Sequence, residues 1–183
     1  MLENAGVPLI ADPADVDETG IKLDCRGKRL GVNETTEILA TAKAQEVASR
    51  HRGRIVLGAD QMLECDGEWF DKPSDRTAAA QQIARLSGRS HRLVSAVVAI
   101  RDGSPIWRFV ESAELTMRDL SPGFIDSYLD KVGEKALSSV GGYQIEGPGI
   151  QLFSTIKGDH FTILGLPLLP LLDFLRQEGV IPR

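Results

Sequence analysis

Two long runs of strand-forming residues, joined by a two-residue turn, constrain the fold of this chain most strongly. The runs "LVSAVVAI" and "IWRFVESAELTM" lie within residues 91–117 and meet at Asp102-Gly103. An Asp-Gly pair suits a tight hairpin turn, so these residues are predicted to form a long β-hairpin. A second, shorter hairpin is predicted around Asp66-Gly67 in "QMLECDGEWF". The fold must therefore contain a sheet that includes hairpins.

Helix signals separate and follow these strands. Residues 33–50 are predicted to form a helix with Asn33 as its N-cap, after an irregular, polar opening. Further helices are predicted from Ser74 to Gly88, after an N-cap at Ser121 with Pro122 in first position, and from Pro167 to Gly179. With 183 residues, this alternation predicts one α/β domain with a mixed sheet and flanking helices.

Composition excludes several classes of function. The chain has 21 basic and 26 acidic residues and a net charge of −5, which argues against a broad nucleic-acid-binding surface but permits a small anionic ligand. No apolar run is long enough to span a bilayer, and the first residues do not resemble a signal peptide. The two cysteines, Cys25 and Cys65, show no metal-ligand spacing. Together these features predict a cytoplasmic protein without a membrane or nucleic-acid partner.

Asp60 is the first candidate for chemistry. It follows the apolar run Arg54–Gly58, which is predicted to be a buried strand, and ligands of open α/β sheets gather where strands end. A turn or helix-cap role is an equal alternative. Asp17-Glu18 is a second acidic group, although such a pair in a loop is usually solvated surface. If Asp17 and Asp60 met, they would offer oxygen ligands to Mg²⁺ or Mn²⁺.

Cationic and glycine-rich segments supply the other candidates. Lys43 lies in the predicted helix, Lys72 precedes a proline after the short hairpin, and "LSGRSH" places Ser87 and Arg89 at a helix-to-strand turn. Taken singly, each is more typical of surface, and His91 in the same motif is more typical of a structural histidine. The segment "GGYQIEGPG", residues 141–149, contains four glycines around Glu146, which allows close backbone approach to a ligand or forms a simple turn.

In this order, the motifs resemble one known family. "DVDE", "AKA", "GADQ", "GEWFDKP", "LSGRSH", "GGYQIEGPG" and "GDHFTILGLPL" resemble the Maf family of nucleoside triphosphate pyrophosphatases along essentially the whole chain. The resemblance implies an α/β fold with a cleft between two lobes, a homodimer, and hydrolysis of a nucleoside triphosphate to monophosphate and pyrophosphate with a divalent cation, Mg²⁺ or Mn²⁺.

Roles follow from matching positions. The resemblance implies that Asp60 is the general base and a metal-associated carboxylate, and that Asp17 is its metal partner. It also implies that Lys43 and Lys72 face the phosphates, and a nearby cation favours the ionised form of Asp60.

The N-terminus departs from the family pattern. Most members open with a strand and a Ser-x-x-Arg phosphate loop before a helix, whereas Met1 here falls inside that helix, at "MLENAG". A misassigned start, a truncation or a true loss of the loop would each explain this, and a true loss predicts a catalytically impaired nucleotide-binding protein or division regulator.

Base specificity is predicted from two further positions. Gln61 and Glu146 are similar to the branch associated with 7-methyl-GTP, whereas the dTTP/UTP branch has Thr and Gln there. An ionised Glu146 is acceptor-only and suits the N1–H and 2-amino donors of guanine. The prediction is therefore 7-methyl-GTP, with a dTTP/UTP-type enzyme as the alternative.

Overall fold

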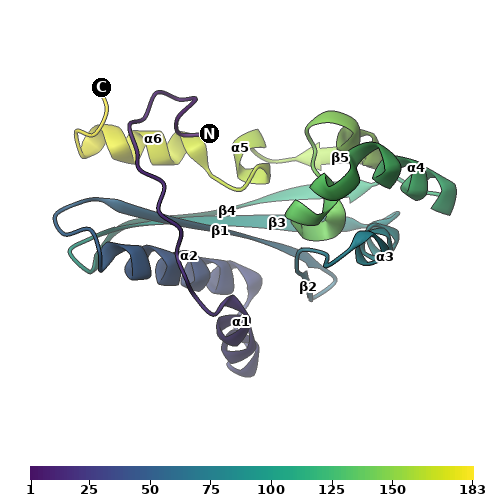
Figure 1. Cartoon of the computed structure of the whole chain (residues 1–183), viewed down its shortest axis with the longest axis horizontal. Helices are drawn as coiled ribbons and strands as arrows, with labels where there is room; N and C mark the ends of the chain where they lie inside the picture. The colour runs from purple at the N-terminus through teal and green to yellow at the C-terminus, as the bar shows by residue number, and fades with distance from the viewer. The chain divides into compact units, whose positions relative to one another are not determined.

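The computed structural model describes residues 1–183 and confirms the predicted α/β organisation (Figure 1). Its five strands form one sheet in the order β2-β1-β3-β4-β5, and the pairs β1–β2 and β4–β5 are antiparallel. The elements are α1 (Glu18–Gly27), α2 (Val32–Ala48), β1 (Val56–Cys65), β2 (Glu68–Phe70), α3 (Arg76–Leu86), β3 (Ser90–Arg101), β4 (Ser104–Met117), α4 (Pro122–Val132), the 3₁₀ helices η1 (Gly133–Ser138), η2 (Val140–Gly142) and η3 (Gly147–Leu152), β5 (Phe153–Lys157), α5 (His160–Ile163) and α6 (Leu168–Gln177). No helix is long and apolar enough to cross a membrane.

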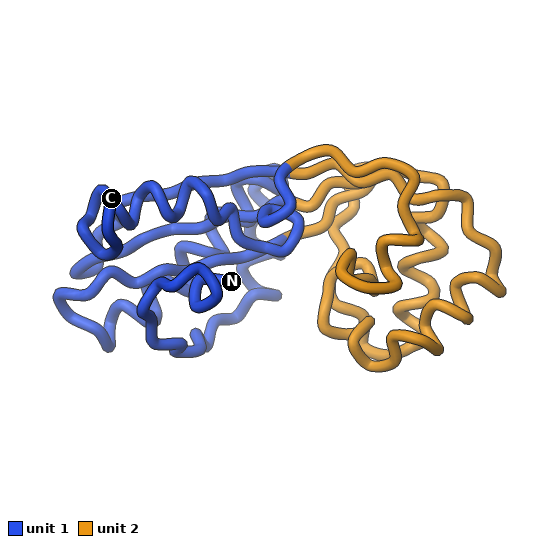
Figure 2. Tube along the Cα trace, turned by 90° about the horizontal axis from the view of Figure 1, so that it is seen from above, with its two compact units in different colours: residues 1–61, 94–112, 159–183 blue, residues 62–93, 113–158 orange.

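The chain divides into two compact units, which Figure 2 shows in different colours. Unit 1 contains Met1–Gln61, Val94–Ser112 and Asp159–Arg183, and unit 2 contains Met62–Leu93 and Ala113–Gly158. The strands β1, β3 and β4 contribute residues to both units. The prediction of one domain with a cleft between two lobes stays a prediction.

Unit 1 has three layers, with α2 on one face of the sheet and α6 on the other (Figure 1). Alternate residues of β3 face the two helices, as a strand with both faces buried requires. Ala96, Val98 and Ile100 pack with α2, whereas Val97 and Ala99 pack with Leu171 and Phe174 of α6. The same alternation in β1 decides which side chains can reach α2.

Unit 2 is built around α3, α4 and the glycine-rich segment. Ala79, Ile83 and Leu86 of α3 are fully buried, at the positions expected for its apolar face. A Cβ on Gly141 would lie 2.7 Å from a Leu63 methyl carbon, and one on Gly149 would lie 1.8 Å from the Gln144 carbonyl oxygen. These glycines are therefore required for packing inside unit 2.

Several local predictions are confirmed. Both Asp-Gly turns join paired strands with positive φ at each residue, 53° and 82° at Asp66-Gly67 and 49° and 78° at Asp102-Gly103. Ser121 caps α4, where its hydroxyl oxygen accepts a hydrogen bond from the Phe124 N–H at 3.2 Å. The last helix begins after Pro167 and ends before Gly179, as predicted.

Three local predictions are wrong. The second helix begins two residues early, with Gly31 as its N-cap, because the Glu34 carboxylate accepts the Gly31 N–H at 2.8 Å. The opening is not wholly irregular, since α1 begins at Glu18 after an Asp17 cap. The strand predicted at Arg54–Gly58 does not end before Asp60, because β1 continues without a break from Val56 to Cys65.

Candidate active site

Asp60 lies in the middle of β1 and points toward α2. Val56 packs in the α2 cluster, whereas Leu57 and Ala59 pack on the α6 face, so even-numbered residues of this part of β1 face α2. The carboxylate is thus positioned by a continuous strand, and not by the end of a strand as predicted. Only 9% of the side chain is exposed, which requires a partner for its charge.

Gly58 brings the partner within reach. It lies on the same face of β1 as Asp60, and a Cβ there would be 2.2 Å from the Ala40 carbonyl oxygen and 2.6 Å from the Ala44 nitrogen. Such distances are available only to glycine, so α2 rests directly on the β1 backbone at this point. Lys43 immediately precedes Ala44, so its side chain lies beside Asp60, the next residue of β1 that faces α2.

The Lys43 ammonium lies between two carboxylates. Its Nζ is 2.5 Å from Asp60 Oδ1 and 2.7 Å from Glu18 Oε1. Exposure of the side chains rises outward, from 9% for Asp60 to 23% for Lys43 and 44% for Glu18. One buried acid, one half-buried cation and one half-buried but more exposed acid form a polar group that opens to solvent on the Glu18 side.

Burial and ion pairing act in opposite directions on these groups. Desolvation raises the pKa of Asp60 above its ordinary value, although the Lys43 hydrogen bond and charge act to lower it. Burial alone would lower the pKa of Lys43, but hydrogen bonds to Asp60 and Glu18 outweigh it and raise that pKa. Lys43 therefore stays charged, while Asp60 is a stronger base than an exposed aspartate.

Glu18 is a site residue that the sequence indicated only as part of the acidic pair Asp17-Glu18, with the metal role predicted for Asp17. Asp17, the predicted metal partner, caps α1: its carboxylate accepts a hydrogen bond from the Gly20 N–H at 2.9 Å, and its metal role stays a prediction. The next residue then turns inward to Lys43. The signal was present, because an Asp followed by a Glu is a common start of a helix.

Gln61 faces the opposite side of β1 from Asp60. Its amide nitrogen donates to the Ser95 hydroxyl at 3.0 Å and to the backbone carbonyls of Thr162 and Ile163 at 3.1 and 3.0 Å. These contacts tie β1 to β3 and α5 inside unit 1. The role of Gln61 in base selection stays a prediction, and it would have to act through the amide oxygen or through α5.

The other predicted residues belong to unit 2, where they fall into two kinds. Lys72 and Glu146 are exposed and have no hydrogen-bonding or ionic partner. Arg89 is paired with Asp66 at 2.7 Å, and the Ser87 hydroxyl accepts the Leu120 N–H at 2.8 Å. Lys72 and Glu146 are thus available to a ligand, whereas Ser87 and Arg89 already make internal contacts.

His91 is a buried residue of the interior of unit 2, as predicted for a structural histidine. It is 2% exposed, and its Nε2 lies 2.7 Å from the Tyr143 hydroxyl. Its Nδ1 is buried without a partner, and desolvation lowers the pKa of His91 to about 4. It is neutral at physiological pH and packs in the interior of unit 2.

The carboxylates fit a weakly held magnesium or manganese ion better than a protein-enclosed one. No group of three or more His, Cys, Asp or Glu side chains converges to form a cage. Asp60 and Glu18 each contact the Lys43 ammonium through one carboxylate oxygen, so the second oxygen of each is the hard ligand that a cation beside Lys43 would use. Mg²⁺ is commonly held by one or two carboxylates together with substrate phosphates and water.

Comparison with known proteins identifies the family. A family model described as "Maf-like protein" matches residues 1–178. A nucleoside triphosphate pyrophosphatase of Paramagnetospirillum magneticum is 52% identical over 179 residues, covering 98% of this chain and 92% of that protein. Proteins named 7-methyl-GTP pyrophosphatase from Brucella abortus and Mesorhizobium japonicum are 49% and 52% identical over 181 residues, each covering 99% of this chain and 91% of the relative. The chain belongs to the family of Maf-like proteins.

Proposed function

We propose that this protein is a nucleoside triphosphate pyrophosphatase that hydrolyses 7-methyl-GTP to 7-methyl-GMP and pyrophosphate. The observation that carries the proposal is the group of Asp60, Lys43 and Glu18, in which a half-buried cation separates a buried carboxylate from a more exposed one. A purely structural ion pair has no need for the second, solvent-facing carboxylate. The family relatives named as pyrophosphatases support the same activity.

Asp60 is the proposed general base. Its carboxylate accepts a proton from water while the water oxygen forms a bond to the α-phosphorus. The bond from this phosphorus to the bridging oxygen breaks, and pyrophosphate leaves with the electron pair. The raised pKa of Asp60 strengthens the base, because proton transfer is most efficient when the pKa of the base approaches the working pH.

Lys43 is the proposed electrostatic partner. Its raised pKa keeps the ammonium charged, so it can neutralise charge that develops on the phosphoryl oxygens. Lys72, exposed and unpaired in unit 2, is proposed as a second phosphate contact. Ser87 and Arg89 would first have to leave their internal partners, so we assign them smaller roles in substrate binding.

A divalent cation is part of the proposal. Asp60 and Glu18 would hold it. Asp17 is proposed as a more distant metal partner, because its carboxylate already accepts the capping hydrogen bond of α1. When bound, Mg²⁺ or Mn²⁺ would supply charge neutralisation to the phosphate oxygens.

Glu146 is the proposed reader of the base. It is exposed and without a partner, and its carboxylate can accept hydrogen bonds from the N1–H and 2-amino groups of guanine. The positive charge of an N7-methylated guanine favours the same carboxylate. Gln61 would contribute indirectly, through the position of α5.

The proposal also places the protein in the cytoplasm as a homodimer. Both cysteines are free and buried, which suits a reducing compartment. Light scattering of the purified protein tests the oligomeric state, and a monomer at all concentrations would contradict this part of the proposal.

Pyrophosphate release from a panel of nucleotides tests the proposed activity. We expect release from 7-methyl-GTP to exceed release from GTP, dTTP and UTP, to require Mg²⁺ or Mn²⁺, and to stop with EDTA. Asp60→Asn should abolish release, and Glu146→Gln should lower the preference for 7-methyl-GTP. Faster hydrolysis of dTTP or UTP would refute the substrate assignment. Tight binding of triphosphates without pyrophosphate release would refute the enzymatic proposal and favour a regulator.

A further inference from the structure

The position of Glu18 is not explained by the helix that carries it. Cys25 is the only residue of α1 that is fully buried, so this helix has little apolar surface to fix it. Glu18 is nevertheless 2.7 Å from Lys43, at the first position of α1. The segment before α1 must therefore supply much of the constraint on Glu18.

Residues 12–18 approach α2 in an alternating pattern. Asp12, Ala14, Val16 and Glu18 are half-buried, whereas the residues between them are exposed. This period of two is that of an extended chain with one face against the protein. Ala14 packs against the apolar cluster that α2 forms with the sheet. Glu18 thus belongs to the same inward face as Asp12, so a constraint on residues 12–15 is transmitted to it.

Three residues of α2 and of the turn that follows it contact successive parts of residues 12–18. Lys43, Glu46 and Arg50 are spaced i, i+3 and i+7, which places them on one side of the helix. The Arg50 guanidinium contacts residues 12 and 13, the Glu46 carboxylate contacts residue 15, and Lys43 contacts residue 18. The segment therefore runs antiparallel to α2, with Glu18 at the active-site end.

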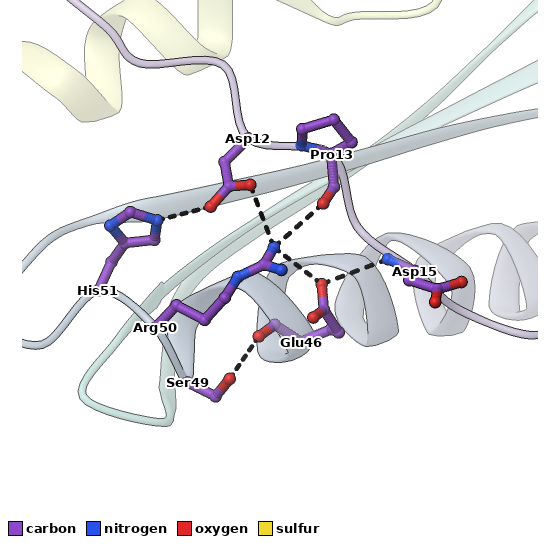
Figure 3. Close-up of polar contacts among 7 residues, drawn as sticks. All are labelled: Asp12, Pro13, Asp15, Glu46, Ser49, Arg50 and His51. Atoms are coloured by element: carbon purple, nitrogen blue, oxygen red, sulfur yellow. Dashed lines mark hydrogen bonds and ion pairs between the residues drawn. The ribbon is translucent and has the colours of Figure 1, made fainter.

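Arg50 is the centre of the polar network in Figure 3. Its Nη2 donates to the Asp12 carboxylate at 3.2 Å, to the Pro13 carbonyl oxygen at 3.0 Å and to the Glu46 carboxylate at 3.1 Å. Glu46 in turn accepts the Asp15 N–H at 3.3 Å. A single nitrogen of Arg50 thus links residues 12 and 13 of the extended segment to Glu46 of α2.

Asp12 is also bound by His51, whose Nε2 lies 2.7 Å from its second carboxylate oxygen (Figure 3). This hydrogen bond, with the charge of Arg50, holds the pKa of Asp12 below its ordinary value. Both oxygens of Asp12 are therefore occupied, and the carboxylate is charged at neutral pH. Several weak surface contacts joined through shared atoms constrain geometry better than isolated ion pairs do.

We propose that Arg50 and Glu46 are positioning residues for the active site, and that they act through residues 12–15 to keep Glu18 on Lys43. Neither residue makes a hydrogen bond or ion pair between its side chain and Lys43 or Asp60. Their effect is to fix the start of α1, so that the outer carboxylate of the site is present before substrate binds. This proposal rests on the proposed function, because positioning matters only if Lys43 and Glu18 take part in the reaction.

Kinetics of full-length variants test the proposal. We expect Arg50→Ala to lower kcat/KM for pyrophosphate release by about tenfold, the middle of the range for coupled contacts. Arg50→Lys should recover most of this loss, since one lysine nitrogen can serve the three acceptors that Nη2 serves. Arg52→Ala removes the same charge two residues away and should leave kcat/KM within about twofold of the wild type.

A double-mutant cycle separates positioning from general destabilisation. In a Glu18→Ala background, Arg50→Ala should change kcat/KM by less than about twofold, because the residue that it positions is already absent. An equal loss in both backgrounds would overturn the proposal, and so would wild-type kcat/KM for Arg50→Ala. If Arg50→Ala does not fold, Glu46→Ala takes its place in the same cycle.

Hydrogen exchange gives a test that does not depend on activity. Amides of residues 18–27 should exchange about tenfold faster in Arg50→Ala than in Arg52→Ala, with β1 unchanged. Equal exchange in the two variants would overturn the proposal even in an active enzyme. If the wild type releases no pyrophosphate, the proposed function fails, while exchange still decides whether Arg50 fixes α1.

Discussion

Replacing Gly58 with alanine should separate α2 from β1 and disable the site. The new Cβ would lie 2.2 Å from the Ala40 carbonyl oxygen, 2.6 Å from the Ala44 nitrogen and 2.7 Å from the Ala44 Cβ. Ordinary contact begins near 3.4 Å, so relief requires a shift of roughly 1 Å. Two of the three atoms belong to the helix backbone, so no side-chain rotation can supply that shift.

The expected cost is at the upper end for overpacking, about 3 kcal/mol of unfolding free energy. For a chain of this size that corresponds to a fall in Tm of roughly 6–12 °C. The same shift would stretch the 2.5 Å contact between Lys43 and Asp60. A displacement of about 1 Å at a catalytic group can lower the rate about 100-fold.

Thermal melting and pyrophosphate release, measured where the variant is still folded, provide the assay. Gly123→Ala is the matched control, because a Cβ at this position of α4 meets no atom within 4 Å. It should be neutral or stabilising by about 0.5–1 kcal/mol. A Gly58→Ala protein with wild-type Tm and activity would refute the close packing of α2 on β1.

Three further outcomes follow from individual side chains. Lys43→Met leaves Asp60 buried without a counter-charge, so kcat should fall about 10²–10³-fold and the acidic limb of the pH–rate profile should move to higher pH. Because the folded pKa of His91 is about 4 against an unfolded value of 6.5, the folded state binds fewer protons between these values. The unfolding free energy is then at its full value above pH 6.5 and falls by about 3 kcal/mol as the pH drops to 4. In His91→Gln, the unfolding free energy measured by urea denaturation should depend less on pH over this range. Gln61→Ala leaves the Ile163 carbonyl without its side-chain donor and should cost about 1–3 kcal/mol, with faster hydrogen exchange in α5 that distinguishes it from a surface change such as Gln81→Ala.

Local signals predicted most elements of the fold because the physics that forms them is local. The two Asp-Gly turns require positive φ, and Asp and Gly accept it more readily than other pairs do. The Ser121-Pro122 start and the apolar spacing of α6 are likewise decided within a few residues. The N-cap of α2 was placed incorrectly because Glu34 folds back to Gly31, which displaces Asn33 into the helix.

Non-local contacts explain what the sequence did not predict. An aspartate after an apolar run indicates the end of a strand when only neighbours in sequence are considered. In the structure, a lysine from α2 neutralises Asp60, so the strand continues through it. The choice between Asp17 and Glu18 also depends on tertiary structure, because capping α1 engages the first carboxylate and directs the second to Lys43.

A single helix carries both constraints on Lys43, and this has a measurable consequence. Gly58 sets the approach of α2 to β1, and Arg50 sets the approach of residues 12–18 to the same helix. Each constraint places one carboxylate beside the Lys43 ammonium. Once the contact between Lys43 and Asp60 is broken, the position of Glu18 should therefore have little further effect on the rate. Gly58→Ala and Arg50→Ala should therefore be non-additive, with the double variant retaining at least about threefold more kcat/KM than the product of the single effects predicts. Multiplicative losses would mean that Asp60 and Glu18 act on the reaction independently, and the shared-ammonium description of the site would then be wrong.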